Sequence, residues 1–420
     1  MRHPLPMRSP RLSILCLSQM PPSPPRFGAQ ARMHGLWTAL ARRHDLTSVA
    51  LADEEFDLEE CRAAMGRYSQ EVLLVPNPKG KGGAAKRALQ LRSLASVHSF
   101  ERHRVEVPAL QRGLDRLLRS RRFDVVNVEF PYLGYLRLRQ APSGAPPPAV
   151  VVDSHEIAHE LVRQLGRSGG GLGRALYAEL DWRKLRREEL AAYGSADGVA
   201  VCSVADQARI LRGLPRARTV VVPNAADVEH YRPRPTDPPP DGRTVLFFGL
   251  LSTQPNVDGI RWFVQEIWPR IIRSRPDARL KILGKGAPPE VQALAAPGIE
   301  VTGFVEDLRP HLASAAAVVV PLRLGGGTRL KIVEAMAMAR PVVSTALGAE
   351  GIDARPGGEL LLADLPEAFA AAVVQLVDDP ATAARLGSAA RRLAEERYSW
   401  EGAATAMEGL FGQILDGRTT

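Results

Sequence analysis

The chain has 420 residues, of which 45% are hydrophobic and 24% are charged, and its formal net charge at pH 7 is +9. This length and composition exclude a disordered chain and a small fold stabilised by disulfides or metal, and they predict two or three domains. No apolar run approaches the roughly 20 residues that cross a bilayer, and the first such run is too short for a secretory signal, so we expect a cytoplasmic protein.

The positive charge is concentrated in the first half of the chain. Residues 1–235 carry 36 Lys and Arg against 24 Asp and Glu, a net charge of +12, whereas residues 236–420 carry 19 against 22, a net charge of −3. This asymmetry predicts an anionic partner for the first half: a phosphorylated ligand, an anionic lipid surface or nucleic acid. Solvated arginines are the simpler explanation, and the lack of any nucleic-acid fold signature predicts that no nucleic acid binds.

The first half opens with a basic, Pro-rich segment, residues 1–11, in which Met7 is an alternative start of translation. Val-rich runs then alternate with helical patterns, as in parallel strands covered on both faces, which predicts a doubly wound α/β sheet. We predict strands at residues 12–17, 46–51, 71–75, 124–128, 149–152, 198–202 and 219–222. We predict helices at residues 31–43, 84–96, 108–120, 157–165 and 174–193.

A linker divides the chain at residues 232–243, where proline and charged residues exclude helix and strand. The alternation then restarts, with strands predicted at residues 244–248, 280–283, 300–301, 316–320 and 341–344. Helices are predicted at residues 257–272, 289–295, 307–315 and 329–339, and two or three more between 366 and 415. We therefore predict two Rossmann-like domains, residues 1–231 and 244–420, facing each other across a ligand cleft, with the last helix free to pack back on the first domain.

The three cysteines, Cys16, Cys61 and Cys202, are far apart in the sequence. They show no C-x-x-C spacing, and two of them lie in strand-like runs. We therefore expect buried thiols in a reducing compartment and no metal ligands among them.

The segment Pro321–Thr345 carries the clearest chemical pattern. A strand ends in the glycines Gly325, Gly326 and Gly327, and a helix is predicted to open at Thr328 as its N-cap. Free N–H groups there would bind an anion, with Lys331 adding charge and Glu334 placed to accept ribose hydroxyls. The alternative is a plain turn in which Lys331 and Glu334 face solvent.

This segment resembles the donor-site signature of glycosyltransferase family 4, the "glycosyl transferases group 1" of GT-B fold, in a branch associated with bacterial surface polysaccharides. Phe247–Gly259, Lys281–Gly286 and Val301–Leu308 resemble the family's strand ends, and Val221–Asp227 resembles its hinge turn. Residues 244–350 match closely, whereas the first half matches mainly in the order and spacing of its elements.

The resemblance implies that Glu334 binds the donor ribose, that Phe304 flanks the nucleobase and that Gly249 approaches the diphosphate. Two positions depart from the family pattern. Family members often carry a further carboxylate where this chain has Gly326, and many carry Arg and Lys after the Gly249 strand, where this chain has Leu250 and Asn256. We therefore expect Lys331, with Arg329 or Arg323, to offset the charge of the leaving diphosphate.

In the first half, Asp153, His155 and Glu156 follow a buried strand, which places them at the cleft. His155 resembles the family histidine that contacts the donor sugar; the alternative is a histidine that satisfies loop backbone. Gly28, in the turn Pro24–Arg32, resembles the glycine of the loop that covers the donor phosphates. Arg26 and Arg32, in the same turn, would suit an anion.

The segment Lys79–Arg92 joins a basic loop to an amphipathic helix. It is suited to an anionic membrane surface on which lipid-linked acceptors reside. The alternative is a solvated loop and an ordinary surface helix.

Together these features predict an enzyme that transfers a sugar from a nucleotide-diphosphate sugar to a hydroxyl of a glycan or lipid-linked acceptor. The resemblance implies retention of anomeric configuration and no cofactor or essential metal, and the lack of an Asp-x-Asp sequence agrees with the absence of a metal. A nucleotide-sugar epimerase and a non-catalytic nucleotide-sugar-binding subunit stay open as alternatives. A nicotinamide dehydrogenase is excluded, because no G-x-G-x-x-G follows the first strand.

Overall fold

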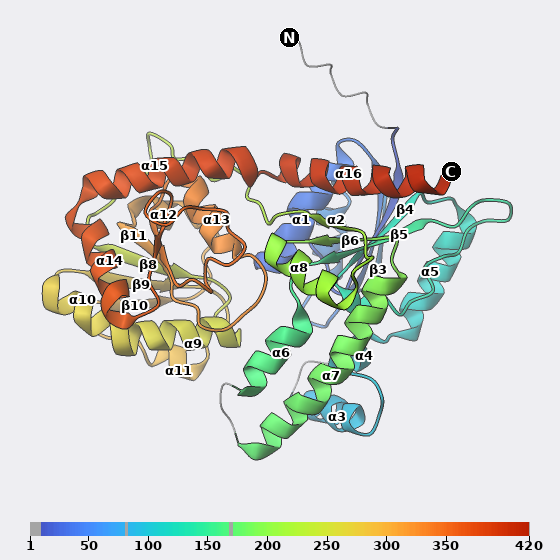
Figure 1. Cartoon of the computed structure of the whole chain (residues 1–420), viewed down its shortest axis with the longest axis horizontal. Helices are drawn as coiled ribbons and strands as arrows, with labels where there is room; N and C mark the ends of the chain where they lie inside the picture. Colours follow the sequence, from blue (N-terminus) through green and yellow to red (C-terminus); the bar gives the residue numbers. More distant parts are fainter. Residues whose placement is uncertain (1–9, 80–82, 168–170, 420) are drawn as a thin grey trace, which may run out of the picture.

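The computed structural model describes residues 10–79, 83–167 and 171–419 and consists of two α/β domains that lie side by side (Figure 1). The first domain has a seven-stranded sheet of order β3-β2-β1-β4-β5-β6-β7, and the second has a six-stranded sheet of order β10-β9-β8-β11-β12-β13. Every pairing within both sheets is parallel. The predicted pair of doubly wound domains is therefore confirmed. Met7 and residues 80–82 lie outside the described residues.

The first domain contains all seven predicted strands, with ends that differ by one or two residues. The strands are β1 (Ser13–Ser18), β2 (Asp45–Ala52), β3 (Glu71–Pro76), β4 (Val125–Glu129), β5 (Ala149–Ser154), β6 (Gly198–Val201) and β7 (Thr219–Val221). The helices are α1 (Gly28–Ala41), α2 (Leu58–Met65), α3 (Gly83–Leu94), α4 (Phe100–Val105), α5 (Pro108–Ser120), the 3₁₀ turn η1 (Pro131–Leu133), α6 (Ala158–Arg167), α7 (Leu172–Ser195) and α8 (Val204–Gly213). The short helices α2, α4 and α8 were not predicted from the sequence.

The second domain also follows the prediction, with one added edge strand, β13. Its strands are β8 (Thr244–Phe248), β9 (Arg279–Leu283), β10 (Ile299–Thr302), β11 (Ala317–Val320), β12 (Val342–Ser344) and β13 (Leu361–Leu362). Its helices are α9 (Gln254–Trp262), the π turn η2 (Phe263–Ile267), α10 (Trp268–Ser274), α11 (Pro289–Gln292), α12 (Arg309–Ser314), α13 (Leu330–Ala337), α14 (Pro366–Asp378) and α15 (Pro380–Arg397). The single helix predicted at 257–272 is divided by the π turn just before Pro269, which has no N–H to continue the α-helical bonds.

The last helix, α16 (Trp400–Thr419), returns to the first domain, along whose edge it lies in Figure 1. Met407, Phe411 and Ile414 are buried in the same core cluster as α1. The ring of Trp400 fills the space above Gly35 of α1, where a Cβ would lie 2.2 Å from the ring. The end of the chain is thus a structural part of the first domain.

The chain crosses between the domains twice, before β8 and between α15 and α16. The two crossings contact each other, because the Ala226 N–H donates to the Tyr398 carbonyl at 2.9 Å and Ala226 pairs with Ser399. Any opening of the cleft must therefore take place around this shared line.

Cys16, Cys61 and Cys202 are all buried and unpaired. Among the described helices, none is both long enough and apolar enough to pass through a bilayer.

Phe411→Ala in α16 should lower the free energy of unfolding of the first domain by about 3–5 kcal/mol, because it empties a fully buried ring position. Leu365→Ala, at an exposed position of the second domain, should change it by less than about 0.5 kcal/mol. Denaturant unfolding followed by fluorescence measures both. An unchanged midpoint for Phe411→Ala would show that α16 does not belong to that core.

Candidate functional site

The glycine-rich loop before α13 contacts the first domain at the carboxyl end of β5. Gly327 has a φ of +68°, and a Cβ on it would lie 2.4 Å from the carbonyl oxygen of His155. The Asn224 Nδ2 group donates to the Thr328 carbonyl at 2.8 Å, and the Thr328 hydroxyl donates to the Cys202 carbonyl at 3.2 Å. The loop and His155 therefore meet in the predicted cleft between the domains.

The prediction that Thr328 caps the helix is wrong. The helix begins at Leu330, its N-cap position is Arg329, and no side chain caps it. The Thr328 hydroxyl instead bonds the other domain, and the Arg329 side chain turns back to the carbonyls of Gly326 and Gly327. A tertiary contact has taken the place of the local cap.

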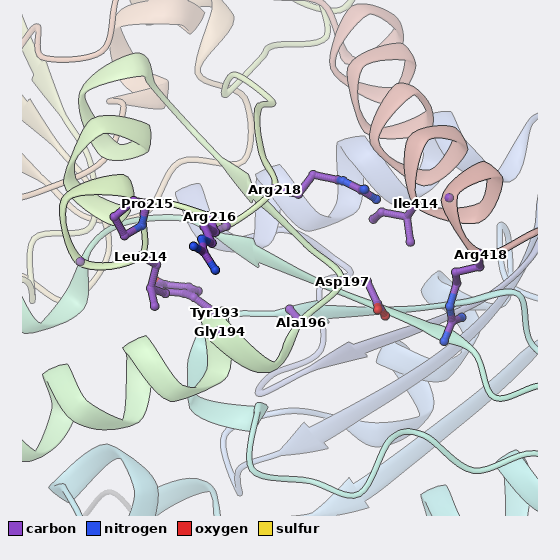
Figure 2. Close-up of a pocket in the computed structure, with 13 residues that line it drawn as sticks. Tyr193, Gly194, Ala196, Asp197, Leu214, Pro215, Arg216, Arg218, Ile414 and Arg418 are labelled. Carbon is purple, nitrogen blue, oxygen red and sulfur yellow. The ribbon is translucent and has the colours of Figure 1, made fainter. Parts of the chain in front are cut away.

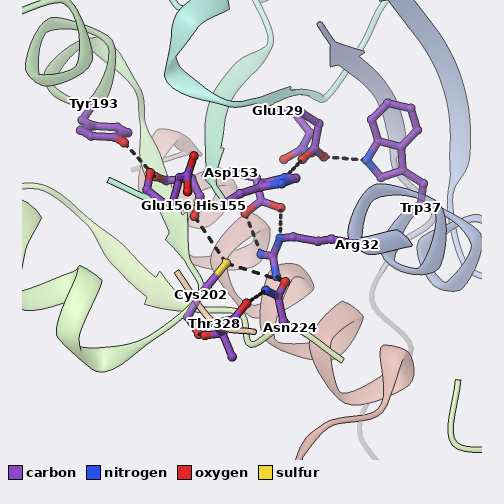
Figure 3. Close-up of polar contacts among 12 residues, drawn as sticks. Arg32, Trp37, Glu129, Asp153, His155, Glu156, Tyr193, Cys202, Asn224 and Thr328 are labelled. Atoms are coloured by element: carbon purple, nitrogen blue, oxygen red, sulfur yellow. Dashed lines mark hydrogen bonds and ion pairs between the residues drawn. The ribbon is translucent and has the colours of Figure 1, made fainter. Parts of the chain in front are cut away.

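Arg32 of α1 is buried at the centre of this contact (Figure 3). Its Nε and Nη2 groups donate to the two Asp153 carboxylate oxygens at 3.2 and 2.7 Å, and its Nη1 group donates to Asn224 Oδ1 at 2.9 Å. Arg26 pairs with Glu60 at 2.7 Å. Both arginines thus bond protein groups, which corrects the expectation that they serve a ligand anion.

His155 is held from one side by a buried carboxylate. Its Nε2 atom lies 2.7 Å from Glu129 Oε2, while Glu129 Oε1 accepts from Trp37 Nε1 at 2.7 Å and from Asn127 Nδ2 at 2.8 Å (Figure 3). The Phe130 ring lies 4.0 Å from the imidazole. The side chain therefore bonds a carboxylate, and the alternative of a backbone-satisfying histidine does not describe it.

These contacts define the protonation of His155. Burial lowers the pKa of His155, so the ring is neutral. Burial raises the pKa of Glu129, and the hydrogen bonds from Trp37 and Asn127 oppose this rise. We assign the proton to Nε2, which donates to Glu129. The Nδ1 atom is buried and has no partner among the described residues, so its lone pair is left to accept a hydrogen bond.

The other side of the site is built on β8 and α13. Gly249 has a φ of +152°, and the ammonium of Lys331 lies 2.8 Å from where its Cβ would be. Lys331 donates to Asn256 Oδ1 at 2.8 Å and lies 4.5 Å from the Phe247 ring centroid. Burial lowers the pKa of Lys331 to about 7.

Of the three cations expected to offset a diphosphate, Lys331 is the one that lies beside Gly249. Arg323 instead pairs with Asp258 at 2.8 Å, and Arg329 turns to the carbonyls of its own loop. Gly28, at the start of α1, lies against Leu330, since its Cβ would be 3.4 Å from Leu330 Cδ1. The loop after β1 thus meets the start of α13.

Glu334 lies one turn further along α13 and contacts the hinge. The Tyr231 hydroxyl, in the segment between β7 and β8, donates to Glu334 Oε1 at 3.3 Å. Burial raises the pKa of Glu334 to about 7. Phe304, after β10, is 56% exposed, which leaves its ring accessible to a ligand.

Three side chains, His155 among them, have the donor atoms that a metal ion could bind. Glu129, Asp153 and His155 each bring one possible ligand atom within 4.8 Å of the others. The Arg32 guanidinium already neutralises Asp153, and Glu129 accepts three N–H donors. Both carboxylates of the cluster therefore already have protein donors.

The hollow drawn in Figure 2 lies elsewhere in the first domain. Asp197 and Arg218, which line it, directly precede β6 and β7, and Arg418 reaches it from α16. It therefore lies at the amino-terminal edge of the sheet, opposite to His155, which follows β5. Ligands of such sheets bind at the carboxyl edge.

Comparison with known proteins matches a separate family model to each of the two domains. Residues 28–230 match the family model described as Glycosyltransferase Family 4, and residues 242–379 match the one described as Glycosyl transferases group 1. The chain is 28% identical over 139 residues to the "Uncharacterized 44.6 kDa protein in cps region" of Klebsiella pneumoniae, covering 31% of this chain and 36% of that one. It is 29% identical over 263 residues to glycogen synthase of Mycobacterium tuberculosis, covering 59% of this chain and 60% of that one.

Both alignments thus span less than two thirds of the curated relatives' length. Among solved structures, Alr3699/HepE of Anabaena in complex with UDP and glucose superposes with a TM-score of 0.65 at 14% identity, covering 96% of this chain and all of that one. This likeness shows a shared GT-B fold. With one family model covering each of its domains, the chain belongs to the family 4, group 1 glycosyltransferases.

Proposed function

We propose that this protein transfers a sugar from a nucleotide-diphosphate sugar to a hydroxyl of a glycan or lipid-linked acceptor, with retention and without a metal or cofactor. The observation that carries the proposal is the position of Lys331. Its ammonium lies beside Gly249 and one helical turn from Glu334, so a cation and a ribose-binding carboxylate share one face of α13. A diphosphate held there gains the electrostatic stabilisation that its departure from the sugar requires.

His155 supplies the contact to the sugar in this proposal. Its unpartnered Nδ1 accepts a hydrogen bond, and the Glu129 carboxylate fixes the ring in the orientation that presents this atom. Arg32 provides the positive charge next to Asp153 and Glu129, so the cluster needs no metal to balance it. Closure of the domains around the Ala226–Tyr398 line excludes water from the donor.

The cps-region relative and the family resemblance support a role in surface-polysaccharide synthesis. We propose that the protein works in the cytoplasm at the inner face of the membrane. A hollow between α4, η1 and α7 supports acceptor entry from that side. Tyr132 lines this hollow and stacks on Phe130 at 5.8 Å, and Phe130 contacts His155.

A surface for the membrane is formed by α3 and α7, which project together from the first domain (Figure 1). Five of the nine exposed large hydrophobic residues among the described residues lie there: Leu91, Leu94, Val97, Leu176 and Leu180. The two helices are joined by bonds from Tyr177 to Ser93 at 3.0 Å and from Lys184 to the Ser93 carbonyl at 2.5 Å. The two helices therefore lie against each other in this projecting part of the domain.

The charge of this face suits an anionic bilayer. Residues 72–100 contain no Asp or Glu, and α3 presents Lys86, Arg87 and Arg92 to solvent. An exposed apolar face bordered by cations is the pattern of a peripheral membrane contact. The Arg187 side chain, which lines the hollow, bonds the Val97 carbonyl at 2.6 Å, so the face and the hollow are continuous.

The transfer itself is tested by incubating the protein with a panel of nucleotide-sugars, with and without lipid acceptors extracted from cells. A transferase releases nucleotide diphosphate and adds mass to an acceptor, and His155→Ala should lower the rate on the order of 10²-fold while keeping donor affinity. His159→Ala is the matched control, since His159 bonds Glu189 on α7. An interconverted sugar with no donor consumed would indicate an epimerase, and thermal stabilisation alone a binding subunit.

Affinity for the intact nucleotide-sugar should be highest near pH 7. Diphosphate raises the Lys331 pKa from about 7, so above pH 7 binding takes up a proton and weakens by up to about tenfold per pH unit. Ribose hydroxyls favour ionised Glu334 and lower its pKa from about 7, so below pH 7 binding releases a proton and weakens. Calorimetric titration between pH 5 and pH 9, at about unit steps, measures both limbs.

Lys331→Met should remove the alkaline limb and Glu334→Gln the acid limb. Lys281→Met and Glu300→Gln are the controls, because these residues form an ion pair of 3.6 Å on β9 and β10. Equal pH profiles for all five proteins would contradict both assignments.

Membrane binding is measured by co-sedimentation with phosphatidylcholine vesicles that contain phosphatidylglycerol, at about 0.1 M salt. Leu91→Ser/Leu180→Ser should weaken binding at least tenfold, roughly the loss expected from two inserted side chains. Lys86→Gln/Arg87→Gln should weaken it about fivefold per residue. Leu365→Ser/Leu362→Ser is the matched control, since these leucines are 68% and 39% exposed against 68% and 40% for Leu91 and Leu180.

Wild-type protein that stays in the supernatant, or α3–α7 variants that bind like the wild type, would contradict the membrane surface. Neither outcome bears on donor binding.

A further inference from the structure

The Glu156 carboxylate, at the contact between the domains, has no hydrogen-bond or ion-pair partner among the described residues. It follows His155 at the carboxyl end of β5, and its Cβ lies 3.3 and 3.7 Å from where Cβ atoms on Gly327 and Gly326 would be. Its backbone is fixed, because the Ser154 hydroxyl donates to its carbonyl at 3.0 Å. Its carboxylate accepts no hydrogen bond and forms no ion pair with a described residue.

The groups around Glu156 do not fill the capacity of its carboxylate to accept hydrogen bonds. Arg329 is the nearest cation, but it bonds the carbonyls of Gly326 and Gly327 and forms no ion pair with Glu156 within the described structure. Burial raises the pKa of Glu156 to about 7. A partly buried carboxylate of this kind is costly unless a ligand supplies hydrogen-bond donors.

Two neighbouring residues thus present unfilled acceptors, the Nδ1 atom of His155 and the carboxylate of Glu156. Such a pair repels a phosphate and suits a ligand with several O–H donors, which is the chemistry of a sugar. The cation that suits phosphate, Lys331, lies instead beside Gly249 on the other domain. The site therefore has an acceptor side and a cationic side.

We propose that Glu156 binds hydroxyl groups of the sugar in the nucleotide-sugar donor and so selects which sugar is transferred. The assignment rests on the proposed function and fixes the direction of the donor, with the sugar toward the first domain and the diphosphate toward Lys331. Gly326 faces the same space across the cleft. Its φ lies outside the left-handed region, and Glu156 Cβ, at 3.7 Å, is the one atom within 4 Å of a Cβ placed on it.

Because Gly326 lies opposite Glu156, a pair of substitutions can remove the carboxylate at residue 156 of the first domain and add one at residue 326 of the second. Glu156→Gln should weaken binding of the nucleotide-sugar about tenfold or more while changing affinity for the sugar-free nucleoside diphosphate less than about twofold. Glu156→Ala/Gly326→Glu should recover most of the lost discrimination between the two compounds, and Glu156→Ala alone should not. Glu160→Gln is the matched control, since Glu160 pairs with Arg209 on α8 at 3.1 Å.

Isothermal titration of each variant with the two compounds gives the result. Wild-type affinity of Glu156→Gln for the nucleotide-sugar, or an equal loss for both compounds, would overturn the role of Glu156 while leaving the donor site intact. A wild-type protein that binds neither compound would overturn the proposed function itself.

Discussion

Arg32 is buried between the two domains, where its guanidinium binds Asp153 and Asn224 at once. Asn224 in turn donates to the carbonyl of Thr328 in the glycine-rich loop. One cation therefore connects α1, the carboxyl end of β5, the hinge and the start of α13. Removing one partner of a buried ion pair costs about 3–5 kcal/mol, because the other charge is left uncompensated. The position of His155, two residues after Asp153, and of the loop opposite it both depend on this contact.

The site built around Arg32 is chemically divided. The first domain contributes acceptors, namely the Nδ1 atom of His155 and the Glu156 carboxylate, and the second contributes Lys331 and Glu334 along one helix. The two halves become a site only when the domains meet. In the proposed function this division requires both sheets, because the first orients two acceptors, whereas α13 of the second orients a cation and a carboxylate.

The fold could be predicted because most strands are local runs of apolar residues that end at a turn, so the order of elements can be identified from short stretches of sequence. Lys331, Glu334, Gly249 and His155 were predicted as site residues in the same way, from local patterns and a family resemblance. The contacts that position them could not be found, because Arg32 is 121 residues from Asp153 and Trp37 is 92 from Glu129. A buried acid at the end of a strand, Glu129, was the available signal. Thr328 failed as a cap because a carbonyl of the other domain competes for its hydroxyl.

The packing of α16 on α1 also bears on how the protein is made. The first domain buries Met407, Phe411 and Ile414, which come after the whole sheet of the second domain in the sequence. Until α16 has been made, no Trp400 ring covers Gly35, whereas every strand of the second domain's sheet precedes α16. The core of the first domain is therefore complete only once the second domain has been translated, although most of the first domain precedes it in the sequence.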